Sequence, residues 1–128
     1  MVREPRLQGL WQRNNKNKNM KSIDFNSKTK IKIRFDRIKP FVNYCKVTGE
    51  KEFCNVIVEY IPNDKVLDII EYRKFFEIGF NELIENIAII VFEEISKTIQ
   101  PLYLKVTVFL EGNENLTDWS VTIDSDNK

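Results

Sequence analysis

The chain has 128 residues, of which 42% are hydrophobic and 30% charged, and its formal net charge is +1. These values describe one ordinary folded domain with a modest core rather than a disordered chain. The sequence contains no histidine, which excludes a Ser-His or Cys-His catalytic pair and a histidine-bound zinc site. No apolar run reaches membrane-spanning length, and the first 20 residues lack the apolar core of a secretory signal. Because only two cysteines are present, we expect a reducing, cytoplasmic setting.

The charge is unevenly distributed along the chain. Residues 1–30 contain eight Lys or Arg and two acidic residues, a balance of +6, which leaves −5 for the remainder. Residues 1–28 are rich in Asn, Lys and Arg without a sustained hydrophobic period, so we expect a basic, disordered arm there. Such an arm can contact phosphates or remain a solvated tail. We expect a single folded domain at 29–124 and a tail at 125–128, and either Met1 or Met20 can be the start.

Hydrophobic periodicity predicts six elements. In chain order these are strands at 30–36 and 53–61, helices at 67–77 and 82–99, and strands at 102–110 and 119–123. We expect Asn81 to cap the second helix, and Trp119, Val121 and Ile123 to form the buried face of the last strand. Two strands, two helices and two strands in this order predict an α+β fold, an antiparallel sheet with both helices on one face.

The stretch that contains candidate reactive side chains is residues 41–52, which read FVNYCKVTGEKE. Cys45 lies on a predicted loop that leads into a strand, where reactive side chains are commonly held. Without histidine, the proton-transfer partner of a nucleophilic Cys45 has to be a carboxylate, a lysine or water. Glu52, seven residues later, is the nearest carboxylate beyond the Thr48-Gly49 turn. The alternative is that Cys45 is a small buried hydrophobe and Glu52 a solvated strand residue.

Glu85 is a second candidate carboxylate. On the predicted helix it shares a side with Ile89 and Phe92, at spacings of i+4 and i+7. A carboxylate on an apolar flank is desolvated unless it finds a partner, and such positions are enriched in functional sites. The alternative is that this flank meets solvent or a basic side chain.

These residues resemble a known family, the QueF nitrile reductases of queuosine biosynthesis. The run CKVTGEKE at 45–52, followed by VIVEYIP at 56–62, is similar to that family's nucleophilic cysteine, Pro-x-Thr-Gly, acid and strand ending in Tyr-Ile-Pro. The run QPLYLKV at 100–106 is similar to its helix-ending Asp-Pro-Arg-Tyr segment. Counting back from Pro101, Glu85 falls on the glutamate that holds the deazaguanine base in that family. The resemblance covers about residues 31–123.

The departures from the reductases favour a related group. The stretch that binds NADPH in the reductases is DIIEYR at 68–73 here and lacks most of the basic and hydroxyl groups. Ile84 replaces the family's histidine, and Glu52 replaces its aspartate. Loss of the cofactor stretch with retention of the cysteine, an acid and Glu85 is the pattern of the archaeal QueF-like amidinotransferases of archaeosine formation. Their Glu-Glu-Phe-Lys-Lys motif is similar to IEYRK at 70–74.

The resemblance implies a tunnelling fold, in which ββααββ subunits form β-barrel rings, pentameric or decameric, with sites at subunit boundaries. It implies that ammonia converts 7-cyano-7-deazaguanine in the tRNA D-loop to archaeosine through a thioimide on Cys45, without a cofactor. Glu52 would transfer protons and Glu85 would bind the base, while Lys30, Lys32 and Arg34 are candidates for tRNA phosphate contacts. An NADPH-dependent nitrile reductase and a non-catalytic tunnelling-fold binding protein remain the alternatives.

Overall fold

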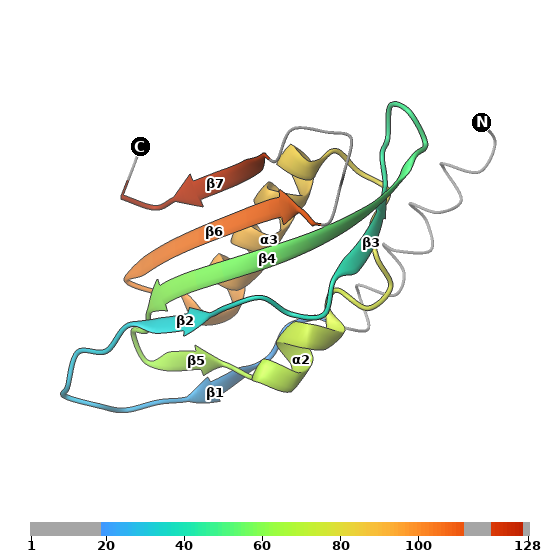
Figure 1. The fold of residues 1–128 in the computed structure, drawn as a ribbon. Coiled ribbons are helices and arrows are strands. Elements are labelled where there is room, and N and C mark those ends of the chain that lie inside the picture. Colours follow the sequence, from blue (N-terminus) through green and yellow to red (C-terminus); the bar gives the residue numbers. More distant parts are fainter. Residues whose placement is uncertain (1–18, 112–118, 127–128) are drawn as a thin grey trace.

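A computed structural model of the chain describes residues 19–111 and 119–126. The elements follow one another as shown in Figure 1. They are β1 Ser22–Asp24, β2 Ile33–Phe35, β3 Phe41–Tyr44, β4 Lys51–Ile61, β5 Lys65–Leu67, α2 Ile69–Lys74, α3 Ile84–Ile99, β6 Tyr103–Leu110 and β7 Ser120–Asp124. None of the described helices is long and apolar enough to cross a membrane.

The long strand β4 is the centre of a five-stranded antiparallel sheet. One edge of β4 pairs with β6, from Cys54 opposite Leu110 to Ile61 opposite Tyr103, and β6 pairs in turn with β7. The other edge of β4 pairs with β3 at its first residues and with β2 near its end. A separate two-stranded sheet joins β1 and β5. The predicted antiparallel sheet is therefore confirmed, with β1, β3 and β5 as short strands that the sequence pattern did not reveal.

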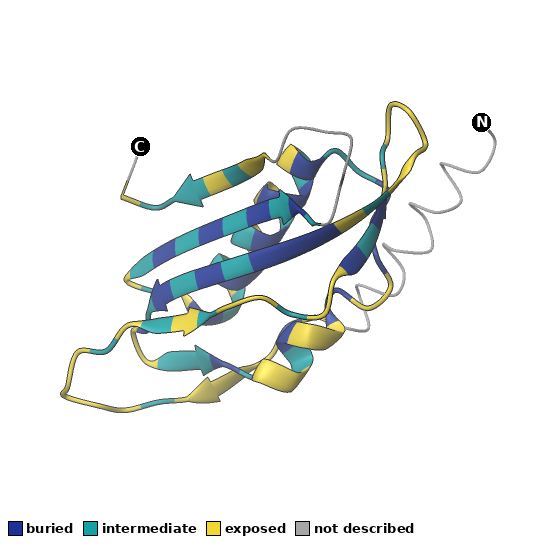
Figure 2. Cartoon of the chain, viewed as in Figure 1, coloured by how far each residue is buried: buried dark blue, intermediate teal, exposed yellow. Residues whose placement is uncertain are grey.

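Both helices pack on the same face of the main sheet, as predicted. Alternate residues of β6 are buried, as Figure 2 shows, because successive side chains of a strand point to opposite faces. Helix α3 covers this buried face with Ile87, Val91 and Ile95, all fully buried. Helix α2 and the turn that follows it contribute aromatic rings to the same core. Tyr72 packs against Phe35 and Phe76 against Phe41, at ring-centroid distances of 4.9 and 5.0 Å.

Helix α2 is shorter than the predicted range 67–77. Residues 65–67 form β5 instead, and the Asp68 side chain then caps the helix by accepting a hydrogen bond from the Ile70 amide at 2.9 Å. An extended N-cap residue with an acceptor oxygen is the usual way to satisfy the first amides of a helix. The predicted cap at Asn81 is wrong, because α3 begins after Leu83, which provides no side-chain cap.

Two further expectations differ from the structure. The ordered region begins before the expected boundary at residue 28, since β1 pairs with β5 and Met20 is buried. The backbone amide of Met20 donates a hydrogen bond of 3.2 Å to the carboxylate of Glu94 on α3. The rest of the predicted arm, residues 1–18, lies outside the described residues. Trp119 is 41% exposed and lies before β7, so it does not belong to the buried face, whereas Val121 and Ile123 pack against the core.

Candidate functional site

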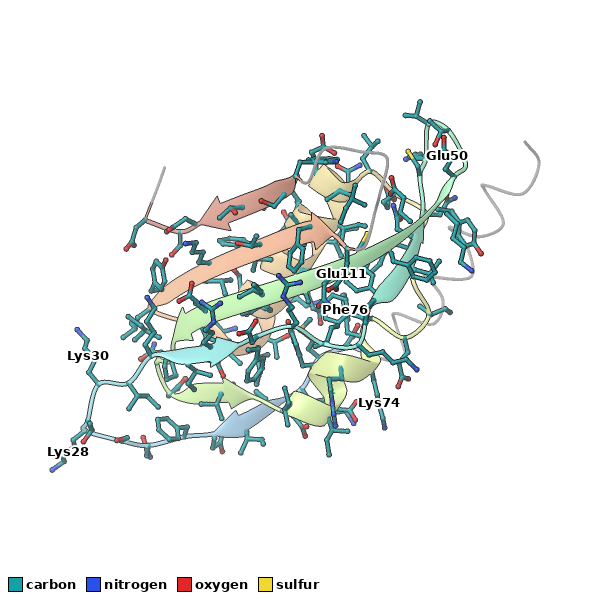
Figure 3. The ribbon with its side chains drawn as sticks, in the orientation of Figure 1. Lys28, Lys30, Glu50, Lys74, Phe76 and Glu111 are labelled. Carbon is teal, nitrogen blue, oxygen red and sulfur yellow. The ribbon has the colours of Figure 1, made fainter. Side chains whose placement is uncertain are left out.

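The hairpin between β3 and β4 positions Cys45. This hairpin extends beyond the neighbouring strands in Figure 1, and Glu50, just before β4, is labelled on it in Figure 3. The Cys45 amide donates to the Glu50 carbonyl at 2.9 Å, and the Gly49 amide donates to the Cys45 carbonyl at 2.8 Å. Gly49 has a φ of 75°, a left-handed conformation in which glycine is favoured. As predicted, Cys45 therefore lies on a loop, and its partly exposed thiol is free.

Glu52 is held by a buried asparagine on the neighbouring strand. Asn43 and Glu52 lie opposite each other in the β3–β4 pair. The Asn43 Nδ2 donates to Glu52 Oε1 at 2.9 Å, and the Asn43 side chain is fully buried. Cys45 lies two residues beyond Asn43, just past the end of β3. Nothing local in the sequence marks Asn43 as a hydrogen-bond partner of Glu52, so Asn43 was not among the predicted site residues.

The connection between α2 and α3 runs alongside β3 and brings α3 to the hairpin. The Phe80 amide donates to the Val42 carbonyl, and the Tyr44 amide donates to the Phe80 carbonyl, both at 2.9 Å. Two residues further on, the Glu82 amide donates to Asn43 Oδ1 at 3.0 Å and its carbonyl accepts from Asn43 Nδ2 at 2.8 Å. This connection therefore starts α3 next to the residues that carry Cys45 and Glu52.

The Glu82 side chain belongs to the same cluster. Its Oε1 is 3.7 Å from Lys46 Nζ, in the residue that follows Cys45, and accepts a hydrogen bond of 3.2 Å from Asn86. The cluster of Cys45, Lys46, Glu52 and Glu82 thus brings a thiol, an ammonium group and two carboxylates to one end of the sheet. Thiol, ammonium and carboxylate groups are those that nucleophilic and proton-transfer chemistry requires.

Glu85 lies in the first turn of α3 and is exposed. Its neighbour on the helix, Ile89, is 45% exposed. In the single chain, the flank of α3 around Glu85 therefore faces solvent, and Glu85 is not desolvated. This outcome is the alternative given for Glu85 in the sequence-based prediction. No side-chain hydrogen bond within the described parts of the chain joins Cys45, Glu52 and Glu85 directly. The structure instead links Glu52 to the start of the helix that carries Glu85.

The second cysteine is part of the core. Cys54 has no exposed surface. Burial, followed by the nearby negative charge of Glu52, raises the pKa of the Cys54 thiol from 9.0 to about 12. A thiolate is the reactive form of cysteine, so Cys54 is unreactive at neutral pH. Since the sequence has only two cysteines, Cys45 is the one candidate nucleophile among them.

A groove with basic side chains lies beside the hairpin. We call it the basic groove; it has a volume of about 550 Å³ and lies between residues 38–42 and α2. Lys39, Arg73, Lys74 and Glu77 supply its charges, and Figure 3 shows Lys74 pointing away from α2. Lys74 pairs with Glu71 at 3.5 Å, whereas in the described residues no carboxylate lies within 4.0 Å of the Lys39 or Arg73 charged groups. By contrast, Lys32 and Arg34 each pair with Glu59 at 3.7 Å.

The architecture defines the class of protein. A crystal structure of the archaeosine synthase QueF-Like in its apo form aligns with a TM-score of 0.61 and 24% identity, over 78% of this chain and 96% of that one. A putative dihydroneopterin aldolase, FolB, from Vibrio cholerae aligns with a TM-score of 0.57 and 15% identity, over 75% and 97% of the two chains. These identities establish the fold alone, and the predicted α+β tunnelling fold is confirmed.

Sequence comparison leads to the same group. The chain is 35% identical over 66 residues to the archaeosine synthase of Pyrobaculum calidifontis. The matching segment covers 50% of this chain and 61% of that relative's length. No protein-family model matches the chain. The similarity to the QueF-like archaeosine synthases, predicted from the sequence, is thus confirmed.

Proposed function

We propose that the protein is a tRNA-modifying amidinotransferase that uses ammonia to convert 7-cyano-7-deazaguanine in the tRNA D-loop to archaeosine. One observation carries the proposal. Cys45 is a partly exposed thiol on the same hairpin as Glu52, whose carboxylate is held by Asn43, in a chain similar to archaeosine synthases.

The reaction balances without a redox step. The Cys45 thiolate adds to the nitrile carbon, so a C–S bond forms while the carbon–nitrogen triple bond becomes a double bond. Glu52 gives a proton to the nitrogen, and its carboxylate can then accept a proton as ammonia attacks the thioimide carbon. The C–S bond breaks, the thiolate leaves, and the carbon retains both nitrogens as an amidine.

The side chains of α2 favour this reaction over reduction of the nitrile. A reductase needs a hydride from a nicotinamide cofactor. In this chain, the acidic groups of residues 68–73, which correspond to the NADPH-binding stretch of the reductases, make contacts within the protein. Asp68 caps α2, while Glu71 pairs with Lys21 at 3.9 Å and with Lys74 at 3.5 Å. The carboxylates of the stretch at 68–73 thus serve structural contacts. The stretch retains Arg73 but lacks most of the basic and hydroxyl groups that bind NADPH in the reductases, which supports ammonia as the second substrate.

We further propose that subunits assemble into a ring and that a neighbour completes the site around Glu85. Strand β7 at one side of the sheet, and β2 and β3 at the other, have no strand beyond them among those described. Such edges can pair with another copy of the chain. Exposed Glu85 would then become desolvated against a neighbour and accept hydrogen bonds from the base. Measurement of the mass in solution tests this, and a fully active monomer of 15.2 kDa would contradict it.

Intact mass spectrometry tests the chemistry. We would incubate the protein with free 7-cyano-7-deazaguanine and, separately, with nitrile-bearing tRNA. The expected result is a mass gain equal to the whole nitrile, which is lost in Cys45→Ala and retained in Cys54→Ala, the matched control. Addition of ammonia should then release an amidine, whereas turnover with NADPH alone would favour the reductase. No adduct with either substrate would leave only a binding protein.

A further inference from the structure

We propose that Asn43 is a positioning residue, which fixes the Glu52 carboxylate relative to Cys45 and to the start of α3. This inference rests on the proposed function of Glu52 in proton transfer. Asn43 is fully buried and makes three side-chain hydrogen bonds, one to Glu52 and two to the backbone of Glu82.

The backbone of Glu82 determines how the Asn43 amide is oriented. The Glu82 N–H requires an acceptor, which is Oδ1 at 3.0 Å, and the Glu82 carbonyl requires a donor, which is Nδ2 at 2.8 Å. An amide with its oxygen and nitrogen exchanged would lose both bonds. Because the amide is fixed in this way, its second N–H has to face Glu52, 2.9 Å away.

This contact restrains a side chain that otherwise has considerable freedom. A glutamate has three rotatable side-chain bonds, and immobilising such a chain costs conformational entropy. The Asn43 N–H engages Oε1 of Glu52, while Oε2 has no hydrogen-bond partner among the described residues. One oxygen is therefore held and the other remains available to exchange a proton with the substrate. An acid that is held in place before the reaction is what efficient proton transfer requires.

The chain offers a matched control for Asn43. Asn55, on β4, is also buried and makes four side-chain hydrogen bonds, one of them from the Val56 amide to its Oδ1 at 2.9 Å. It binds the amide and the carbonyl of Ile38, at 2.9 and 2.8 Å, and a carboxylate oxygen of Glu111. Replacing Asn55 therefore removes the same three kinds of contact as replacing Asn43, and one more, without touching Cys45 or Glu52.

The test measures the rate of thioimide formation on Cys45 against pH, with free 7-cyano-7-deazaguanine as the probe and intact mass as the readout. We expect Asn43→Ala to slow adduct formation about tenfold or more, and to slow it no further when Glu52→Gln is already present. Asn43→Asp preserves size but places a second carboxylate beside Glu52. Because like charges resist ionising together, the pH profile should move to higher pH. Asn55→Ala and Asn55→Asp should keep the wild-type rate and profile.

The outcomes separate this inference from the proposed function. If wild-type protein forms the adduct and the Asn43 variants match the Asn55 variants in rate and profile, Asn43 has only a structural role and the inference is wrong. If the wild-type protein forms no adduct with the free base or with nitrile-bearing tRNA, the proposed function fails and the inference falls with it. If Asn43→Ala does not fold, the pH profile of Asn43→Asp decides.

Discussion

At the scale of single residues, the two cysteines differ because of their surroundings. Cys54 lies in the core beneath the helices, where burial and Glu52 together disfavour its thiolate. Cys45, nine residues earlier, lies on a partly exposed loop. The spacing of the two in the sequence would permit a disulfide, but both are free thiols. The tertiary environment therefore gives two identical side chains opposite roles.

This difference predicts selective alkylation. In native protein at pH 8, iodoacetamide should modify Cys45 and leave Cys54 unmodified, because the Cys54 pKa is raised to about 12. In denaturant both cysteines should react. The measurement is the intact mass after labelling, with Cys45→Ala expected to gain no label in the native state. Two labels on native wild-type protein would show that Cys54 is accessible.

The same pKa also gives a pH dependence of stability. The Cys54 thiol would ionise near pH 9.0 in the unfolded chain but only near pH 12 in the folded one. Its contribution to the free energy of unfolding is therefore complete below pH 9 and is lost as the pH rises toward 12.

At the scale of elements, the connection between α2 and α3 determines where the site is built. Gly79 lies in this connection with a φ of 80°, and a Cβ at this position would be 2.6 Å from the Val42 carbonyl oxygen. That oxygen accepts a hydrogen bond from the Phe80 amide, which is the first of the bonds that hold the connection alongside β3. The absence of a side chain at Gly79 therefore lets Glu82 reach Asn43.

We predict that Gly79→Ala destabilises the protein more than Gly49→Ala. Both glycines have a positive φ, so both substitutions introduce backbone strain of about 1–2 kcal/mol. Only Gly79 has backbone atoms in the way, whereas nothing lies within 4 Å of a Cβ at Gly49. The clash should add about 1–3 kcal/mol. Urea unfolding measures the difference, and equal losses for the two variants would contradict the close approach.

At the scale of the whole molecule, the distribution of paired and unpaired charges bears on the proposed binding of tRNA. Lys32 and Arg34 are adjacent to Glu59, which compensates part of their charge. Lys39 and Arg73, in the basic groove, have no such carboxylate partner in the described part of the chain. An uncompensated cation releases more counterions from a phosphate backbone when it binds.

We therefore predict that Lys39→Ala/Arg73→Ala weakens tRNA binding more than Lys32→Ala/Arg34→Ala. Each double variant removes one lysine and one arginine, so the total charge lost is the same. The groove variant should reduce the dependence of log Kd on log salt concentration by roughly 1.5–2, and the other variant by less. Fluorescence anisotropy with labelled tRNA at several salt concentrations measures both slopes. The prediction fails if the second variant has the larger effect, and both variants should still form the adduct with the free base.

The elements with a local signal could be predicted from the sequence alone. Alternation of apolar and polar residues predicted β4 and β6, and the helical period predicted α3. The prediction that Cys45 lies on a loop leading into a strand was also confirmed. Hydrophobic periodicity depends only on residues that are close in the sequence, so it can be recognised without knowledge of the fold. The stretches at 45–62, 68–74 and 100–106, which together suggested the similarity to the QueF-like archaeosine synthases, were equally local.

The contacts that those residues make could not be predicted without the tertiary structure. Asn43 binds Glu82, 39 positions away, and Met20 binds Glu94 across 74 positions, so neither partner can be read from neighbouring residues. Trp119 follows the alternation of β7, but it lies before the strand and is exposed. Such contacts depend on which strands pair and in what register. A hydrogen bond requires a short donor–acceptor distance, which only the folded arrangement of distant segments provides.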